Sequence, residues 1–147
     1  MSQAHDLIAS CRALYAEIDR LDQAAATKVG VSRNDLRALN VLENGAVSAG
    51  ALARDLGITT GAATALIDRL ERKGLARRMR DPNDRRGVLI EPTPAMFTQL
   101  APLYRGVATR LLAVAERYGE EELRAAIRHL DTVTQAYRDA IEADAVP

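Results

Sequence analysis

The stretch SAGALARDLGITTGAATALIDRLERKGLARRMRDPNDRRGVLIEPTP, from Ser48 to Pro94, decides the fold of this chain. It predicts a helix, a tight turn, a second helix and two short strands joined by a charged loop. Ser48 can cap the first helix, because its hydroxyl can accept a hydrogen bond from a free N–H of the first turn. Gly57 can end that helix in the left-handed conformation that glycine adopts easily. Thr59 or Thr60 can then cap the second helix.

The second helix of this stretch is predicted to have two unlike faces. Its apolar residues recur at spacings of three and four and form one stripe, at Ala63, Leu66, Ile67 and Leu70. On the opposite side its first turns carry small or hydroxyl side chains. A helix that reads base edges needs this profile, because its first turns must enter a major groove only about 12 Å wide.

A charged hairpin is predicted to follow, with strands Leu75–Arg80 and Gly87–Glu91 around the polar tip Asp81–Arg86. Pro-Asn-Asp is typical of turns, and the tip carries two adjacent arginines. From Arg69 to Arg86 the chain has eight basic residues and three acidic ones, although its formal net charge is zero. Local polarity of this kind indicates a nucleic-acid face.

The segment DRLERKGLARRMRDPNDRRGVLI, residues 68–90, resembles the recognition helix and wing of the MarR family of winged-helix transcription regulators. The motif D-R-L-E-x-K-G-L followed by D-P-x-D-R-R carries the resemblance. It implies one MarR-like domain over residues 1–147, mainly α with a small β-wing. A winged helix-turn-helix DNA-binding lobe, about residues 32–92, would be flanked by long terminal dimerisation helices at about 4–28 and 94–144.

The resemblance also implies which residues of the recognition helix contact DNA. Those expected to meet base edges or nearby phosphates are Thr59, Thr60, Gly61, Ala62, Thr64 and Ala65. Arg69 and Arg72 are expected to anchor the phosphate backbone. Asp68 would face phosphates and be repelled unless paired, so we expect a salt bridge to a nearby arginine, Arg86 or Arg72.

In the wing, the second arginine of the D-R-R motif, Arg86, is expected in the minor groove. Arg85 would contact phosphate, and Asp84 would orient the pair through charge-assisted bonds. Because the narrow minor groove of A·T-rich DNA attracts a guanidinium, the wing would read the shape of DNA more than its letters.

Both ends of the chain are predicted to be long helices with an apolar stripe. Such stripes on a small chain indicate burial against a second copy, and MarR-like proteins interlock their terminal helices into a two-fold dimer. The alternative is a bundle of the first and last helices within one chain. A dimer would present its recognition helices to a pseudo-palindromic operator with half-sites about one helical turn apart.

The resemblance implies a repressor that releases DNA when a small phenolic or other aromatic ligand binds. Candidate lining residues of a ligand pocket are Leu14, Leu36, Leu39 and Phe97, whose spacing is also typical of a core. Around Cys11, the segment CRALYAEIDRL is similar to the first helix of the family's organic-hydroperoxide-sensing branch. A redox-sensing repressor is therefore an alternative. No tyrosine lies between Val29 and Glu43, where that branch carries its partners, so Cys11 also reads as a buried small hydrophobe.

A further alternative, of another class, is a helical protein-interaction module that does not bind DNA. The intact D-P-N-D-R-R tip argues against it, since such a module needs no pair of arginines there. A single cysteine excludes an internal disulfide, and no apolar run approaches the roughly 20 residues of a membrane span. With no secretion signal, metal-ligand cluster or nucleophile–base pair in view, we expect a cytoplasmic protein that is not an enzyme and has no cofactor.

Overall fold

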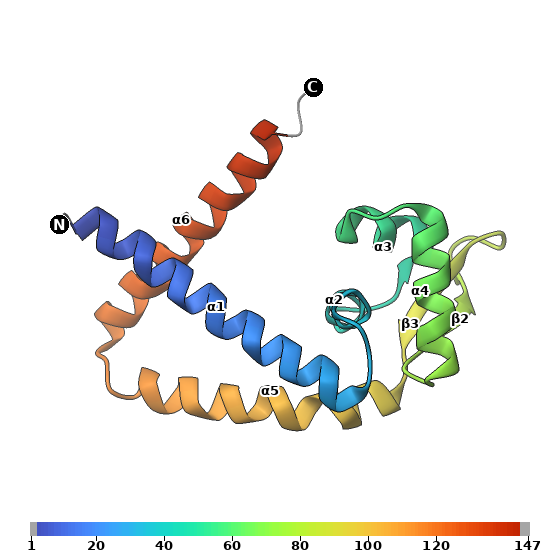
Figure 1. Ribbon diagram of the computed structural model, residues 1–147, viewed down its shortest axis with the longest axis horizontal. Coiled ribbons are helices and arrows are strands. Elements are labelled where there is room, and N and C mark those ends of the chain that lie inside the picture. The colour runs from blue at the N-terminus through green and yellow to red at the C-terminus, as the bar shows by residue number, and fades with distance from the viewer. Residues whose placement is uncertain (1–2, 145–147) are drawn as a thin grey trace. The chain divides into compact units, whose positions relative to one another are not determined.

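The computed structural model describes residues 3–144 (Figure 1). In chain order its elements are α1 (Gln3–Val29), α2 (Arg33–Leu42), β1 (Val47–Ser48), α3 (Ala49–Leu56), α4 (Thr60–Arg72), β2 (Ala76–Arg80), β3 (Val88–Pro92), α5 (Pro94–Ala115) and α6 (Glu120–Asp144). The protein is mainly helical with one small sheet, which confirms the predicted fold class. Most predicted boundaries lie within two residues of the observed ones.

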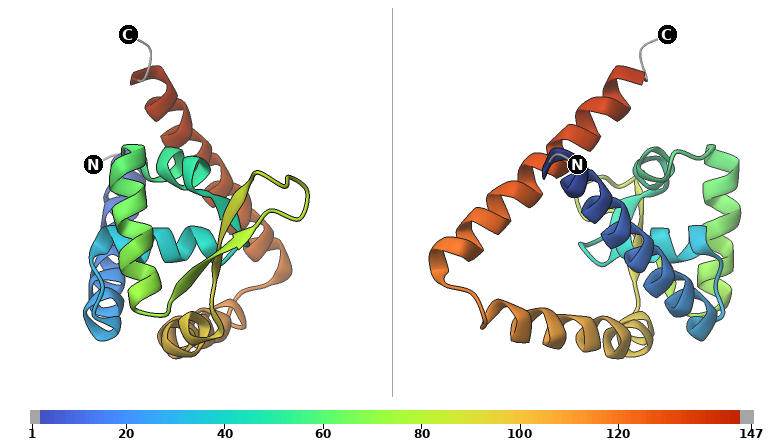
Figure 2. Two further views of the ribbon diagram at one scale, coloured as in Figure 1. Left: turned by 90° about the vertical axis from the view of Figure 1, so that its right-hand side faces the viewer. Right: turned by 60° about the vertical axis from the view of Figure 1, so that its left-hand side comes forward.

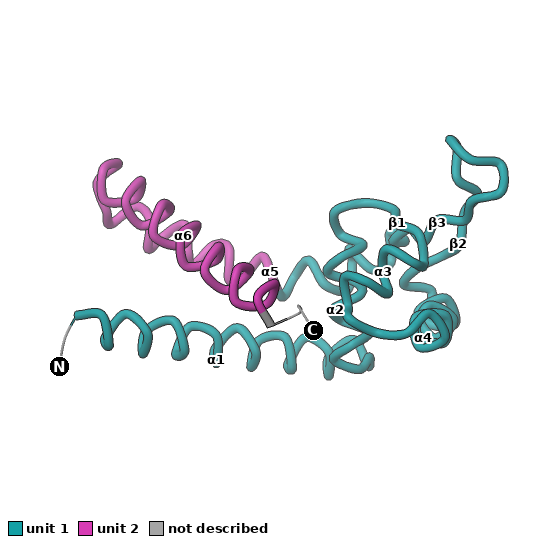
Figure 3. The backbone as a smooth tube through the Cα atoms, turned by 90° about the horizontal axis from the view of Figure 1, so that it is seen from above, with its two compact units in different colours: residues 1–103 teal, residues 104–147 magenta. Residues whose placement is uncertain are grey.

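The chain separates into two compact units, one ending at Leu103 and the other beginning at Tyr104 (Figure 3). The first unit holds every element from α1 to β3 and the first part of α5. The second holds the rest of α5 and all of α6. The prediction of one domain over the whole chain is left open by this division.

Local capping builds the helix-turn-helix. The Ser48 hydroxyl accepts a hydrogen bond from the Ala51 backbone N–H at 3.1 Å, as predicted, and starts α3. Gly57 follows α3 with φ at +67°, a conformation that a side chain would strain. Thr59 is the residue that caps α4, because its hydroxyl accepts from the Ala62 N–H at 3.2 Å. Only three residues therefore separate α3 from α4, which fixes the angle between them.

Capping also begins α2, through a capping box of Ser32 and Asp35. The Ser32 hydroxyl accepts from the Asp35 N–H at 3.1 Å, and the Asp35 carboxylate accepts from the Ser32 N–H at 3.3 Å. The helix buries three leucines in a core shared with α3, α4 and the sheet. The largest fully buried side chains of this core are Leu36, Leu39, Leu42, Leu52, Leu66, Ile67, Leu70, Leu75, Ile90 and Met96.

The sheet has the strand order β1-β3-β2 and is antiparallel throughout. Val47 pairs with Ile90 and Ser48 with Leu89, so the two-residue strand β1 joins the hairpin. In the hairpin Ala76 pairs with Pro92 and Arg80 with Val88. Proline at the last position of β3 therefore does not shorten the strand. Figure 2 shows the β2–β3 tip extending away from the helices of its unit.

The second unit has no buried side chain among its described residues, which reach Ala143. Exposed apolar residues of α5 and α6 include Leu111, Leu112, Ile127, Leu130 and Ile141. In the first unit, the apolar side of α1 is exposed as well. No helix within residues 3–144 is long and apolar enough to cross a membrane.

Candidate nucleic-acid interface

The first two turns of α4 present small and hydroxyl side chains to solvent. All six residues predicted to meet base edges are exposed, while Ala63, Leu66 and Ile67 between and after them are buried. At Gly61, a Cβ would meet nothing within 4 Å, so the packing of this chain does not require glycine there. The small face of α4 is therefore free to approach another molecule closely.

The threonine hydroxyls on this face keep unused bonding capacity. Thr59 accepts a hydrogen bond as the cap of α4, which leaves its own O–H available to donate. Thr64 donates to the Thr60 carbonyl at 3.0 Å, which leaves its oxygen available to accept. The start of the helix thus offers a donor and an acceptor side by side, as base edges and phosphates require.

Two aspartates shape the wing tip through the backbone. Asp81 Oδ1 accepts from the Asn83 N–H at 2.8 Å, and Asp84 Oδ1 accepts from the Arg86 N–H at 2.9 Å. Each is a carboxylate closing a turn two residues ahead. Asp84 was predicted to orient the guanidinium groups of Arg85 and Arg86, but it holds the backbone instead. The charge-assisted bonds expected of it are not formed, and both guanidinium groups are exposed and have no partner within residues 3–144.

Gly87 closes the same tip. Its N–H donates to the Asp84 carbonyl at 2.9 Å, and its carbonyl accepts from the Asp81 N–H at 3.0 Å. A Cβ at this position would lie 2.9 Å from the Asp81 Cβ, closer than side chains tolerate. Glycine therefore allows the loop to fold tightly and to present Arg85 and Arg86 at its end.

Arg78 of β2 joins the wing to the recognition helix. Its Nη2 donates to Asp68 at 2.7 Å, its Nη1 donates to Glu71, and its backbone N–H donates to Glu71 at 2.8 Å. Asp68 was predicted to pair with Arg86 or Arg72; it is paired, but with Arg78. The reason is that β2, which carries Arg78, packs against α4, whereas Arg86 lies in the loop between β2 and β3.

Arg69 does not point freely at solvent. Its guanidinium holds the buried carboxylate of Asp35, with Nη2 at 2.7 Å from Oδ1 and Nε at 3.4 Å from Oδ2. The pair competes with the predicted phosphate contact of Arg69, which stays a prediction. Arg72, in contrast, is exposed and makes no ion pair within the described residues.

The basic side chains without an internal partner mark the candidate surface. In the part of the chain that the structure describes, six between the start of α3 and the end of the hairpin form no hydrogen bond or ion pair through their charged groups: Arg54, Arg72, Lys73, Arg80, Arg85 and Arg86. The sequence analysis did not single out three of them, Arg54, Lys73 and Arg80. Alternation along β2 could have found Arg80, since Arg78 and Arg80 lie on one face of the strand.

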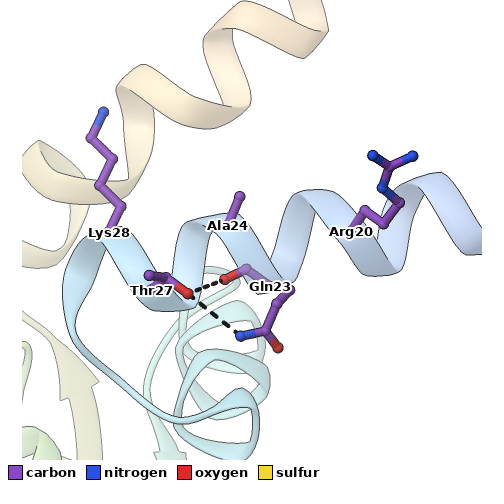
Figure 4. A pocket seen from close by; sticks show the side chains of 5 residues that line it. All are labelled: Arg20, Gln23, Ala24, Thr27 and Lys28. Carbon is purple, nitrogen blue, oxygen red and sulfur yellow. Dashed lines mark hydrogen bonds between the residues drawn. The ribbon is translucent and has the colours of Figure 1, made fainter.

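The four candidate pocket residues do not share one environment. Leu36 and Leu39 are fully buried core residues, which favours the alternative that the sequence left open. Leu14 and Phe97 are about half exposed, at 52% and 42%. A shallow open hollow of about 510 Å³ lies instead along α1, lined by Arg20, Gln23, Ala24, Thr27 and Lys28 (Figure 4).

Cys11 lies on the apolar side of α1 with a free thiol. Its side chain is partly exposed, so the expectation of a buried small hydrophobe is only partly met within one copy of the chain.

A helix-turn-helix followed directly by a basic hairpin defines a winged helix-turn-helix protein. Comparison with known proteins supports this classification. A model of the MarR family matches residues 29–87. The HTH-type transcriptional regulator YcgE of Bacillus subtilis (strain 168) is 41% identical over 102 residues, which are 69% of this chain and slightly under two thirds, 66%, of that protein.

Solved structures share the fold. A MarR family protein from Bacillus stearothermophilus has a TM-score of 0.71 at 23% identity and covers 94% of this chain and 99% of its own. NadR in complex with 4-hydroxyphenylacetate has a TM-score of 0.60 at 24% identity, covering 90% and 92%. The chain belongs to the MarR family of winged helix-turn-helix transcriptional regulators. Members of this family are DNA-binding regulators, not enzymes, in agreement with the sequence analysis.

Proposed function

We propose that this protein is a homodimeric repressor that binds a pseudo-palindromic operator and is released from it by a small ligand. The observation that carries the DNA-binding part is the set of exposed side chains on one lobe. Small and hydroxyl side chains at the start of α4 lie on the same lobe as six basic side chains whose charged groups have no partner among residues 3–144. The first group suits base edges and the second suits phosphates.

In this proposal α4 enters the major groove and the wing follows the neighbouring minor groove. We place Arg86 in the minor groove and Arg85 at a phosphate, because neither guanidinium group has a partner within the described residues. Arg54, Arg72 and Arg80 add phosphate contacts. Arg54 lies in the last turn of α3, the helix that crosses the DNA backbone in helix-turn-helix proteins.

The dimer is proposed from the exposed apolar stripes of the terminal helices. On α1 the stripe comprises Leu7, Ile8, Leu14, Tyr15 and Ile18, each about half exposed or more. A monomer rarely leaves so much contiguous apolar surface in water. Two copies joined about a two-fold axis would present two α4 helices to half-sites about 34 Å apart along one face of the duplex.

For the effector we propose a small phenolic acid, by analogy with the 4-hydroxyphenylacetate named in the NadR structure. Leu14 and Phe97 are accessible to such a ligand, whereas Leu36 and Leu39 serve the core. A ligand that binds the free protein better than the DNA-bound form lowers DNA affinity by the ratio of the two affinities. Adding 4-hydroxyphenylacetate should then raise the melting temperature of the free protein and weaken DNA binding.

The proposal is tested by fluorescence anisotropy with a labelled duplex from the gene's own upstream region, titrated with salt. The native protein should prefer this duplex to random sequence, and Arg86→Ala should weaken binding by about 1–3 kcal/mol. A matched control is Arg77→Gln on the same hairpin, whose guanidinium already pairs with Glu91 at 2.5 Å and should matter less. Absence of binding to any duplex at low salt would refute the DNA-binding function.

A further inference from the structure

Asp35 is the one buried charged residue among residues 3–143, with 3% of its surface exposed. It lies in the first turn of α2. Arg69 of α4 donates to both of its carboxylate oxygens, and Oδ2 also accepts the Ser32 N–H. A buried carboxylate is stable only when its oxygens are hydrogen-bonded, and a guanidinium fork meets both with a fixed geometry. The pair therefore sets how α4 lies against α2.

The pKa of Asp35 agrees with this geometry. Burial alone would raise it, but the hydrogen bonds from Arg69 and Ser32 outweigh burial and hold the pKa below its ordinary value. The carboxylate is therefore charged at neutral pH and attracts Arg69 at full strength.

A second ionic contact ties the same turn of α2 to α1. Arg33, two residues before Asp35, donates from Nη2 to Asp19 at 2.5 Å, and its Nη1 lies 3.5 Å from Asp22. That Nη1 atom is buried and makes no hydrogen bond, so the carboxylates of α1 are what neutralise it. The first turn of α2 is thus fixed to α1 on one side and to α4 on the other.

We propose that Asp35 is a positioning residue for DNA recognition, which together with Arg69 fixes the recognition helix α4 to the turn of α2 that Arg33 fixes to α1. This inference rests on the proposed function. The contact engages the second half of α4 and leaves its first turns free to enter a groove. Without it, α4 can pivot on its apolar stripe. Base-edge contacts, which require several bonds at once, then lose more than phosphate contacts do.

The test compares specific with non-specific affinity. A duplex recovered by the native protein from a random-sequence library and an unrelated duplex of equal length are titrated by anisotropy. Asp35→Asn should lower specific affinity about tenfold, within the range by which residues distant from a ligand modulate binding, and change non-specific affinity by less than about twofold. Asp35 is buried, so it cannot act by touching DNA.

Ser32→Ala is the matched control, because it removes the other half of the capping box and leaves the Asp35–Arg69 pair in place. It should keep the ratio of specific to non-specific affinity. Equal ratios for Asp35→Asn and the native protein, or the same loss in Ser32→Ala, would overturn the inference.

Arg69→Gln breaks the same pair from its more exposed partner, so the test does not depend on the folding of Asp35→Asn. It should lower the ratio, and Arg69→Lys should restore part of it, because lysine keeps the charge without the fork. If Arg69→Gln weakens both affinities alike and lowers the salt slope by about one, Arg69 is a phosphate contact and the positioning role fails. If the native protein shows no preference for any duplex, the proposed function is refuted, and so is this inference, which rests on it.

Discussion

At the scale of single residues, an arginine is available to DNA only if the protein has not already engaged it. Arg69, Arg77 and Arg78 are held by carboxylates of Asp35, Glu91, Asp68 and Glu71. Arg80 lies on the same strand as Arg77 and Arg78 and has no partner in the described part of the chain. Sequence position therefore does not show which arginines are available to bind DNA, whereas the contacts of each guanidinium group do show it.

Arg80→Ala should weaken binding to specific and unrelated duplexes by similar factors and lower the slope of log affinity against log salt by about one. The reason is that a phosphate contact carries no sequence information. Anisotropy at several salt concentrations measures both quantities. An unchanged slope would show that Arg80 does not contact phosphate.

Acid should remove the contribution of Asp35 to stability. Because its pKa is lowered in the folded state, the unfolded chain binds the proton more readily, and folding stability rises with pH between the two pKa values. The contribution is complete above the ordinary pKa of about 3.9 and is lost as the pH falls through the lower folded-state value. Urea unfolding should show the stability difference between native and Asp35→Asn shrinking below about pH 4. A difference that stays constant down to about pH 2.5 would contradict this account.

Whether a contact could be predicted from the sequence depends on how far apart its two residues lie along the chain. The caps at Ser48 and Thr59 each reach three residues ahead, so residue type and spacing predicted the first and narrowed the second to Thr59 or Thr60. The Asp35–Arg69 pair joins residues 34 positions apart, and no local pattern indicates it. The same limit explains why Asp68 was assigned the wrong arginine.

At the scale of elements, the recognition helix and the wing are held together through Arg78. Its guanidinium and backbone N–H meet two carboxylates one turn apart on α4. The pair Arg77–Glu91, in contrast, lies within the hairpin, where the two residues are register partners. The existence of helix, turn, helix and hairpin could be predicted from periodicity and turn residues. The contact between hairpin and helix could not, because it depends on which face of β2 turns toward α4.

Arg78→Gln should loosen the hairpin from α4 and speed hydrogen exchange in β2 and β3. The loss of overall stability should be about 1 kcal/mol or less, because the Arg78 and Asp68 side chains are more than a third exposed and solvent screens their attraction. Arg77→Gln is the control on the neighbouring position and should leave exchange at the β2–α4 contact unchanged. Equal exchange rates in both variants would mean that Arg78 does not hold the wing.

At the scale of the whole molecule, the terminal helices leave apolar stripes exposed to solvent. The core is confined to the first unit, and the described part of the second has no buried side chain. Periodicity predicted the stripes correctly. It does not say which stripe of a second copy each one meets, since α1, α5 and α6 all carry the same kind of surface.

The double variant Leu14→Glu, Ile18→Glu should sediment as a monomer, because dimerisation would bury two carboxylates per chain without partners. Both residues lie on the exposed apolar stripe of α1. Ala16→Glu is the control, since about 100° per residue places position 16 on the opposite face, and it should keep the native sedimentation coefficient. A native protein that is already monomeric at micromolar concentration would contradict the dimer.

The most direct test of the DNA-binding account is selection of duplexes from a random-sequence library by the native protein, followed by sequencing. The account predicts enrichment of two inverted half-sites centred about 10 base pairs apart, flanked by A·T-rich steps where the wings would insert. The same selection with Arg85→Ala, Arg86→Ala should lose the flanking preference and keep the half-sites. If the native protein recovers no common sequence, the claim of sequence-specific DNA binding is contradicted.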